Sequence, residues 1–334
     1  MPVTQSIPPS VGLAPQNASL GIAPLLTELS LGVIPDRNYV FPLAAPLVPV
    51  ARRDAKIMRF GPERFSYVNS QRAARTDSKR VNWGYGMDTI HIPNFSLEHA
   101  ADRMLEVMPK EDLLGVGYHA ENLQILMDLH YQAIEVETAA MVTDAGIYDD
   151  NHKTTLVGGA KLSDPTASLI GASREWSEAI RTSTARRPNL AIIPSRVMDA
   201  IDVLEEVRAR LQPTSSASAT PDMLANWLKV ERVVVAESLV LSEESDELVD
   251  IWGNSIVMAF VNPNAIRGDL AFVPGSDVFK RSPSAFYNYV LDGHPFAEPM
   301  YEERSTKSVV YTVNYDRAPV VTWQGAAFLV QDVL

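Results

Sequence analysis

The sequence predicts an α+β fold, and three observations support this prediction. A long stretch from about residue 119 to 144 has the apolar spacing of a helix, and shorter stretches rich in valine and isoleucine follow it. Helices and strands are mixed along the chain, without the regular alternation of a parallel α/β protein. The length of 334 residues suits two domains, or one domain with large insertions.

The composition excludes several kinds of site. The chain has no cysteine, which excludes disulfides, thiolate zinc sites and cysteine nucleophiles, and suits folding in a reducing cytoplasm. A formal net charge of −12 argues against a free-standing nucleic-acid binder. The first basic residue is Arg37, and the longest apolar runs, such as 256–261, are short. We therefore expect no secretory signal and no membrane partner.

Residues 1–50 form a proline-rich segment with almost no charge. Proline fixes φ and removes a donor, so neither a long helix nor a central strand is expected. Disordered tails are normally polar and charged, whereas this segment is apolar. We interpret it as an extended arm that needs a surface to lie on, and a free tail is the alternative. It holds nine of the 23 prolines: Pro2, Pro8, Pro9, Pro15, Pro24, Pro35, Pro42, Pro46 and Pro49.

Residues 51–93 are strongly basic, with only three acids opposing nine cations through position 82. Scattered aromatic and β-branched residues give modest strand propensity, which predicts a long β-hairpin or extended loop. A two-stranded ribbon is marginal alone in water, so we expect it to rest on a neighbouring subunit. A solvated basic surface is the alternative. The nine cations are Arg52, Arg53, Lys56, Arg59, Arg64, Arg72, Arg75, Lys79 and Arg80.

The helical pattern starts at about residue 97, is broken by Pro109 and by Gly115 and Gly117, and becomes a long helix from 119 to 144, ended by Gly146. At about 1.5 Å per residue it would be close to 40 Å long. Two adjacent apolar stripes predict a broad buried face. One stripe is Leu123, Met127, Tyr131, Ile134, Thr138 and Met141, and the other is Leu126, Leu129, Ala133, Val136 and Ala140.

The remaining sequence mixes shorter helices and strands. Ser163 or Asp164 is predicted to cap a helix with Pro165 in its first turn, and Thr220 to cap another before Pro221. A single helix from Ser195 is predicted to continue through Leu211, followed by a loop. The predicted strands are 154–159, 190–193, 232–236, 248–252, 255–261, 308–313 and 320–330.

The usual catalytic patterns are missing. The six histidines have no metal-site spacing, and no phosphate-binding glycine loop is present. Glu205 and Glu206 are adjacent, so on a helix they cannot face each other as an acid pair. We expect no catalytic, cofactor-binding or metal-binding residue, and no enzyme. One acidic run predicts a solvated loop or a patch for a basic surface of a neighbour: Glu243, Glu244, Asp246, Glu247 and Asp250.

Four stretches carry a family resemblance. KLSDP, ARRPNLAIIPSRVMDAI, TPDMLANWLKVERVVVAES and DIWGNSIVMAFV occur in this order between residues 161 and 261. Their order, spacing and wording resemble the major capsid proteins of tailed bacteriophages, which have the Hong Kong 97-type fold. The resemblance extends more loosely to both ends of the chain.

The resemblance implies an architecture that fits the segments described above. In that fold the basic ribbon is an extended loop over a neighbouring subunit, and the long helix is the spine of a peripheral domain. The implied parts are an N-terminal arm (1–50), an extended β-hairpin loop (51–93), a peripheral domain with the spine helix (94–164), an axial domain (165–299) and a return to the peripheral domain (300–334).

The resemblance also implies a structural function. The protein would self-assemble as hexamers and pentamers into the icosahedral shell of the virion, in the bacterial host cytoplasm, around double-stranded DNA bound without sequence specificity. A separate scaffolding protein and a portal would be partners, and a decoration protein is a further candidate partner. The alternatives are an encapsulin-like nanocompartment shell and, more distantly, a soluble carboxylate-based hydrolase. The candidate inter-subunit contacts are the nine loop cations and Glu243, Glu244, Asp246 and Glu247.

Overall fold

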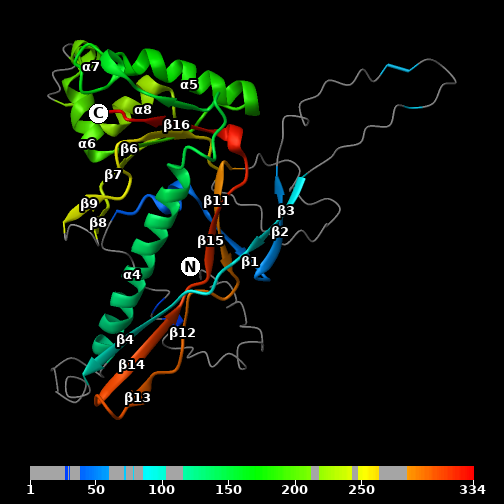
Figure 1. The fold of residues 1–334 in the computed structure, drawn as a ribbon, viewed down its shortest axis with the longest axis vertical. Helices are drawn as coiled ribbons and strands as arrows, with labels where there is room; N and C mark the ends of the chain where they lie inside the picture. The colour runs from blue at the N-terminus through cyan, green and yellow to red at the C-terminus, as the bar shows by residue number, and fades with distance from the viewer. Residues whose placement is uncertain are drawn as a thin grey trace, which may run out of the picture. The chain divides into compact units, whose positions relative to one another are not determined.

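The computed structural model describes two compact units (Figure 1). Unit one draws on Met1–Ile34, Phe95–Met127 and Gly293–Tyr315, and unit two on Pro35–Asn94, Asp128–Asp292 and Asp316–Leu334. Helix α4 (Val116–Val142) contributes residues to both. The structure describes residues 27–28, 30, 38–59, 71–72, 78, 86–102, 116–211, 218–242, 247–262 and 284–334.

A mixed five-stranded sheet organises unit two, in the order β5-β16-β10-β6-β7. The outer pairs β16–β5 and β6–β7 are parallel, and the inner pairs are antiparallel. The inner strands are buried on both faces, which is why their sequences are continuous apolar runs. The strands are β5 (Lys153–Thr155), β6 (Leu190–Pro194), β7 (Arg232–Ala236), β10 (Ile256–Ala259) and β16 (Ala327–Gln331).

Side chains of this sheet alternate between two apolar cores, as the period of two in a strand requires. In β6, Ala191 and Ile193 enter one core, while Leu190 and Ile192 enter the other. The first core is packed by a layer of helices, and the second includes the C-terminal part of α4. The helices of the first core are α5 (Leu169–Thr184), α6 (Ser195–Val203), α7 (Glu205–Leu211) and α8 (Pro221–Leu228).

A second sheet of unit two carries the base of the basic segment. Its order is β1-β11-β15, and β1 is an edge strand, as a proline-containing strand should be. The antiparallel pair β2–β3 packs on it through the apolar cluster of Val48, Val50, Ile57, Ile90 and Ile92 with two tyrosines. The strands are β1 (Leu47–Val50), β2 (Asp54–Arg59), β3 (Gly86–His91), β11 (Phe286–Leu291) and β15 (Arg317–Val321).

Unit one is built on one long strand. β14 pairs with β4 over seven residues on one side, and with β12 and β13 on the other. All seven residues of β14 are buried. The strands are β4 (Ser96–Asp102), β12 (Phe296–Ala297), β13 (Tyr301–Glu303) and β14 (Ser308–Asn314).

The short elements complete the described chain. α2 lies within the proline-rich segment, and Val40, Phe41 and Ala44 are buried there, so the described residues 38–50 lie on the chain's own core. Among the described residues no helix is long and apolar enough to cross a membrane. The short elements are α2 (Phe41–Ala44), η4 (Gly158–Ala160), β8 (Leu239–Leu241), β9 (Leu248–Asp250) and η7 (Gln324–Ala326).

The predicted long helix is present, but of its second apolar stripe only Leu126 is buried. α4 ends at Val142 and not at Gly146. In the first stripe Leu123, Met127 and Ile134 are fully buried, whereas in the second Leu129 and Val136 are exposed. The prediction of one broad buried face was wrong, because polar residues of the same helix take part of the core instead.

Four other local predictions were wrong. The helical pattern from residue 97 is strand β4 at its start, because this segment pairs with β14. The helix from Ser195 is two helices, since Leu204 is extended with ψ 134°. The cap at Ser163 or Asp164 is not used, and Ser168 caps α5 instead. The single strand predicted at 320–330 is β15, a turn and β16.

Candidate assembly surfaces

The base of the basic loop is anchored on unit two by one ion pair. Arg53 donates to the carboxylate of Asp316 over 2.5 Å, and the Asp316 side chain is fully buried. Arg52 and Lys56 lie beside it and are exposed. One predicted contact residue thus has a partner within its own chain, while two present their charges to solvent at the hairpin base.

The other predicted cations are only partly described. Arg72 is exposed and donates to the hydroxyl of Ser78 over 3.4 Å. Arg59 belongs to β2, and only its backbone is described. Four predicted cations lie outside the described residues: Arg64, Arg75, Lys79 and Arg80.

The predicted acidic run lies at the hairpin formed by β8 and β9. Glu247 is exposed immediately before β9, and Glu243, Glu244 and Asp246 lie outside the described residues. Asp250 is placed 3.9 Å from Arg196. The described part of the hairpin is therefore acidic, with Glu247 exposed and Asp250 near Arg196 of α6.

The same hairpin carries an apolar surface that the sequence analysis missed. Leu248 is 66% exposed and Leu241 is 54% exposed, and Leu239 and Val249 are exposed as well. A two-stranded hairpin is marginal in water, and these side chains gain nothing from solvent. Exposed apolar groups gathered on one short element are typical of an interaction surface.

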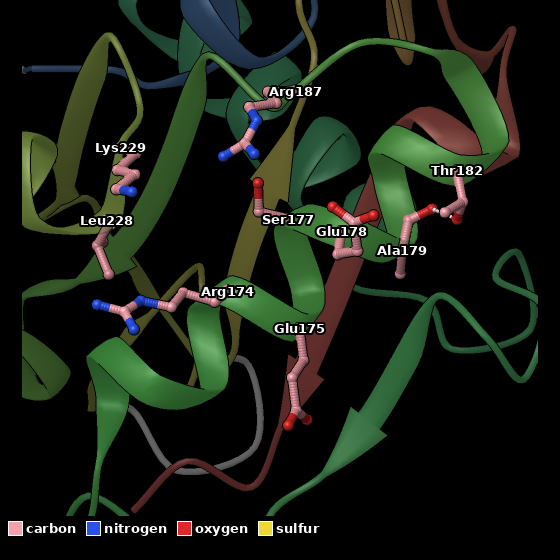
Figure 2. A pocket seen from close by; sticks show the side chains of 9 residues that line it. All are labelled: Arg174, Glu175, Ser177, Glu178, Ala179, Thr182, Arg187, Leu228 and Lys229. Atoms are coloured by element: carbon pink, nitrogen blue, oxygen red, sulfur yellow. Dashed lines mark hydrogen bonds between the residues drawn. The ribbon is translucent and has the colours of Figure 1, made fainter.

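A second surface feature is a cationic pocket between α5 and the C-terminus of α8. Its volume is about 600 Å³, and its lining includes Arg174, Arg187 and Lys229 with the hydroxyl of Ser177. Figure 2 shows the three cationic groups around one space, with Glu175 turned away from them. None of the three cations has a hydrogen-bond or ion-pair partner among the described residues.

The acids of α5 do not neutralise this pocket. Glu178 forms a bidentate ion pair with Arg181 one turn along the helix. The hydrogen bond from Arg181, with the charges of Arg181 and Arg187 nearby, lowers the pKa of the Glu178 carboxyl below its ordinary value. Because the Glu178 carboxylate is paired with Arg181, the three cations of the pocket leave it with an excess of positive charge.

Two buried polar networks hold α4 to its surroundings, and the sequence analysis missed both. Glu135 is fully buried and accepts hydrogen bonds from the backbone of Val40 and Phe41, the Ser238 hydroxyl and the Trp252 indole. These donors lie on three segments far apart in the sequence. A carboxylate in an apolar helix pattern gives no sequence signal of such partners.

The second network involves Arg317, which is only 1% exposed. Its guanidinium donates to both oxygens of Glu137, over 3.0 and 2.7 Å, and lies 3.3 Å from Nδ1 of His130. Bidentate geometry of this kind fixes orientation as well as charge. Arg317 and Asp316 are neighbours, so the start of β15 is bonded both to α4 and to the loop base at Arg53.

One arrangement has the residue types of a hydrolytic triad. Asp149 lies 2.5 Å from Nδ1 of His152, and Nε2 of His152 lies 2.8 Å from the hydroxyl of Ser183. That hydroxyl also donates to the Ala179 carbonyl over 3.2 Å, the usual bond of a helical serine. A side chain at Gly325 would come within 2.9 Å of the Ser183 Cβ. The three groups thus tie the turn before β5 to α5 in a tightly packed place.

Comparison with known proteins gives four useful similarities. No protein-family model matches the chain. A major capsid protein of Burkholderia phage BcepMu is 26% identical over 245 residues, 72% of this chain and 76% of that protein. The crystal structure of a phage-related protein from Bordetella bronchiseptica RB50 has 28% identity and a TM-score of 0.76, covering 93% of this chain and 97% of that one.

More distant structures agree on the fold. The virus-like particle from Pyrococcus furiosus matches with a TM-score of 0.51 at 10% identity, covering 92% of this chain and 98% of that one. The capsid structure of cyanophage P-SCSP1u matches with a TM-score of 0.52 at 10% identity, covering 88% of each chain. Together with the long helix α4, the central sheet and the hairpin base, these similarities show the Hong Kong 97-type fold, and the similarity to the BcepMu protein supports a phage major capsid protein.

Proposed function

We propose that the chain self-assembles as hexamers and pentamers into an icosahedral shell that encloses double-stranded phage DNA. The observation that carries this proposal is the similarity to the BcepMu major capsid protein over 245 residues. The shell is the location of the protein in the virion, and assembly takes place in the bacterial host cytoplasm. The protein acts as a structural component and not as an enzyme.

The proposal includes the parts and partners expected of such a shell. The arm, the extended loop, the peripheral and axial domains and the return segment are proposed with the boundaries predicted from the sequence. A separate scaffolding protein guides assembly, a portal occupies one vertex, and a decoration protein is a further candidate partner. The DNA is held without sequence specificity, and the net charge of −12 fits contact through counterions and not through a basic surface.

The extended loop is proposed to contact an adjoining subunit through its cations. Exposed Arg52, Lys56 and Arg72 support this, since their charges have little to oppose them within the described chain. Replacing Arg72→Glu and Arg75→Glu should reduce the yield of closed shells about tenfold, because like charges would meet at the contact. Arg186→Glu with Arg304→Glu changes the net charge equally and is the control. Equal shell yields in the two double variants would remove the loop from the contact.

An encapsulin-like nanocompartment is the second candidate, because such a shell would use the same fold, which the Pyrococcus furiosus virus-like particle shares with this chain. The molecules enclosed in the particle distinguish a phage capsid from a nanocompartment. Particles from phage-producing cells should protect double-stranded DNA from added nuclease and release it on heating. Particles that hold protein cargo and no nuclease-resistant DNA would favour the nanocompartment.

A further inference from the structure

A shell ring needs two different complementary patches on each copy. Copies related by five-fold or six-fold rotation meet head to tail, so a patch on one copy must fit another patch on the next. Unit two offers two such patches within itself. In Figure 1, α5, which lines the cationic pocket, lies above the central sheet, and the β8–β9 hairpin lies below it.

The cationic pocket is prepared for an acidic occupant. Among the described residues, the side chains of Arg174, Arg187 and Lys229 form no hydrogen bond or ion pair, although the charge of Arg187 lies near Glu178, and Ser177 adds a hydroxyl. Leu228 and Ala179 give the pocket an apolar part of its lining. A protein segment that carries both carboxylates and aliphatic side chains fits this lining of cationic and apolar groups better than a small anion does.

The β8–β9 hairpin has the matching chemistry. Glu247 is exposed, and among the described residues its carboxylate has no hydrogen-bond or ion-pair partner, while Leu248 beside it is the most exposed of the hairpin's apolar residues. In the sequence Glu243, Glu244 and Asp246 come just before it. The base of the hairpin is fixed to α4 through Ser238 and Trp252, which donate to Glu135, and Gln132 donates to the Leu239 carbonyl over 3.3 Å.

We propose that the β8–β9 hairpin of one copy docks in the cationic pocket of the next copy in the ring, with Glu247 facing the pocket cations and Leu248 against the apolar part of the lining. The inference rests on the proposed function, because it assigns the contact between copies that ring formation requires. A carboxylate between cationic side chains forms charge-assisted bonds, and burial of the exposed Leu248 adds apolar contact. Assembly should therefore weaken as salt is added.

A charge exchange tests the contact in the full chain. Arg174→Glu with Lys229→Glu should lower the yield of closed shells about tenfold. Glu247→Lys should lower the yield as well, and Lys229→Glu combined with Glu247→Lys should restore shells. Arg186→Glu with Arg304→Glu is the control for net charge. Circular dichroism melting close to that of the parent chain shows that each variant folds.

Cross-linking gives a second test that does not depend on assembly yield. The chain has no cysteine, so Lys229→Cys and Glu247→Cys in one chain provide the only thiols. Oxidised shells should run as a ladder from dimer to hexamer on a denaturing gel. The pair Arg304→Cys and Glu247→Cys should give monomers.

The outcomes separate this contact from the proposed function. Shells of the unaltered chain together with normal shells of both charge-reversed variants, or cross-linked monomers only, overturn the contact and leave the proposed function standing. Normal shells with reduced DNA content in the pocket variant would assign the pocket to nucleic acid and also overturn the contact. Failure of the unaltered chain to form shells under any condition would overturn the proposed function itself.

Discussion

Glu135 is the side chain on which three distant parts of unit two converge. Its carboxylate receives the backbone N–H groups that start α2, together with Ser238 and the Trp252 indole. A buried carboxylate is costly unless its oxygens are hydrogen-bonded, and here both oxygens are. The residue therefore stabilises the attachment of the proline-rich segment and the β8–β9 region to α4.

Glu135→Gln should lower the free energy of unfolding by about 2 kcal/mol. The change keeps the size of the side chain but turns an amide N–H₂ toward donors, which leaves buried groups without acceptors. Urea unfolding of the unassembled chain, followed by circular dichroism, measures the difference. Glu121→Gln on the same helix is the control, since Glu121 is exposed. A loss no larger than in the control would show that these hydrogen bonds contribute little.

Arg317 is the second buried residue with a specific role. Its guanidinium bonds both oxygens of Glu137, and lysine cannot reproduce two parallel bonds of this kind. Arg317→Lys should destabilise unit two by about 2 kcal/mol, although the charge is kept. Arg304→Lys at an exposed position should change the thermal midpoint little. Equal midpoints for the two variants would contradict this role.

At the scale of elements, the C-terminus of α4 is closed by Tyr148. The hydroxyl donates to the Val142 carbonyl over 2.6 Å, and the side chain is buried. Burial, with a smaller contribution from the charge of Asp144, raises the pKa of Tyr148 well above its ordinary value. The neutral phenol is thus the form that the fold stabilises.

This raised pKa gives a pH dependence with a definite sign. The stabilisation is fully present below about pH 10, the pKa in the unfolded chain, and is lost as the pH rises from there toward the folded pKa. Tyr148→Phe should cost about 1 kcal/mol near neutral pH and should make stability fall less steeply above about pH 10. Unfolding free energies on both sides of that pH measure the slope. An unchanged slope in the variant would contradict the assignment.

The sequence predicted the buried strands well, because their signal is local. β6, β7 and β10 lie within two residues of their predicted limits. β4 was misread because Leu97, Ala100 and Ala101 have helical spacing, and only the distant partner β14 makes the segment a strand. Tertiary pairing outweighs local pattern in such a case.

The predicted starts and ends of two helices were wrong for local reasons. Asp164 looks like a helix cap, but its carboxylate accepts bonds from the N–H and hydroxyl of Thr166 in a turn, and Ser168 caps α5. The break at Leu204 leaves no signal, since Ile201, Leu204 and Val207 are all buried and the apolar spacing continues across it. Local hydrogen bonding and a single extended residue decide these limits.

Candidate surface residues were harder to predict than elements. The cations around the base of the loop follow from composition, but the pairing of Arg53 with Asp316 does not. The cationic pocket joins residues 174 and 229, which only the packing of α5 against α8 brings together. The resemblance to capsid proteins gave the family correctly, while the contacts between subunits stay predictions.

At the scale of the whole molecule, the described part of the chain combines a packed scaffold with exposed apolar and charged surfaces. Two apolar cores flank the central sheet, so unit two has its own means of folding. The exposed leucines of the β8–β9 hairpin, the unpaired cations of the pocket and the basic hairpin base contribute nothing to that folding. Surfaces of this kind are stabilised when copies associate.

The most direct test of this account is negative-stain electron microscopy of the purified full chain, with size-exclusion chromatography beside it. We expect rings or closed shells of uniform size, eluting at megadalton mass, when the chain is produced alone or with its scaffolding protein. A stable monomer near 36.7 kDa under both conditions would contradict the account.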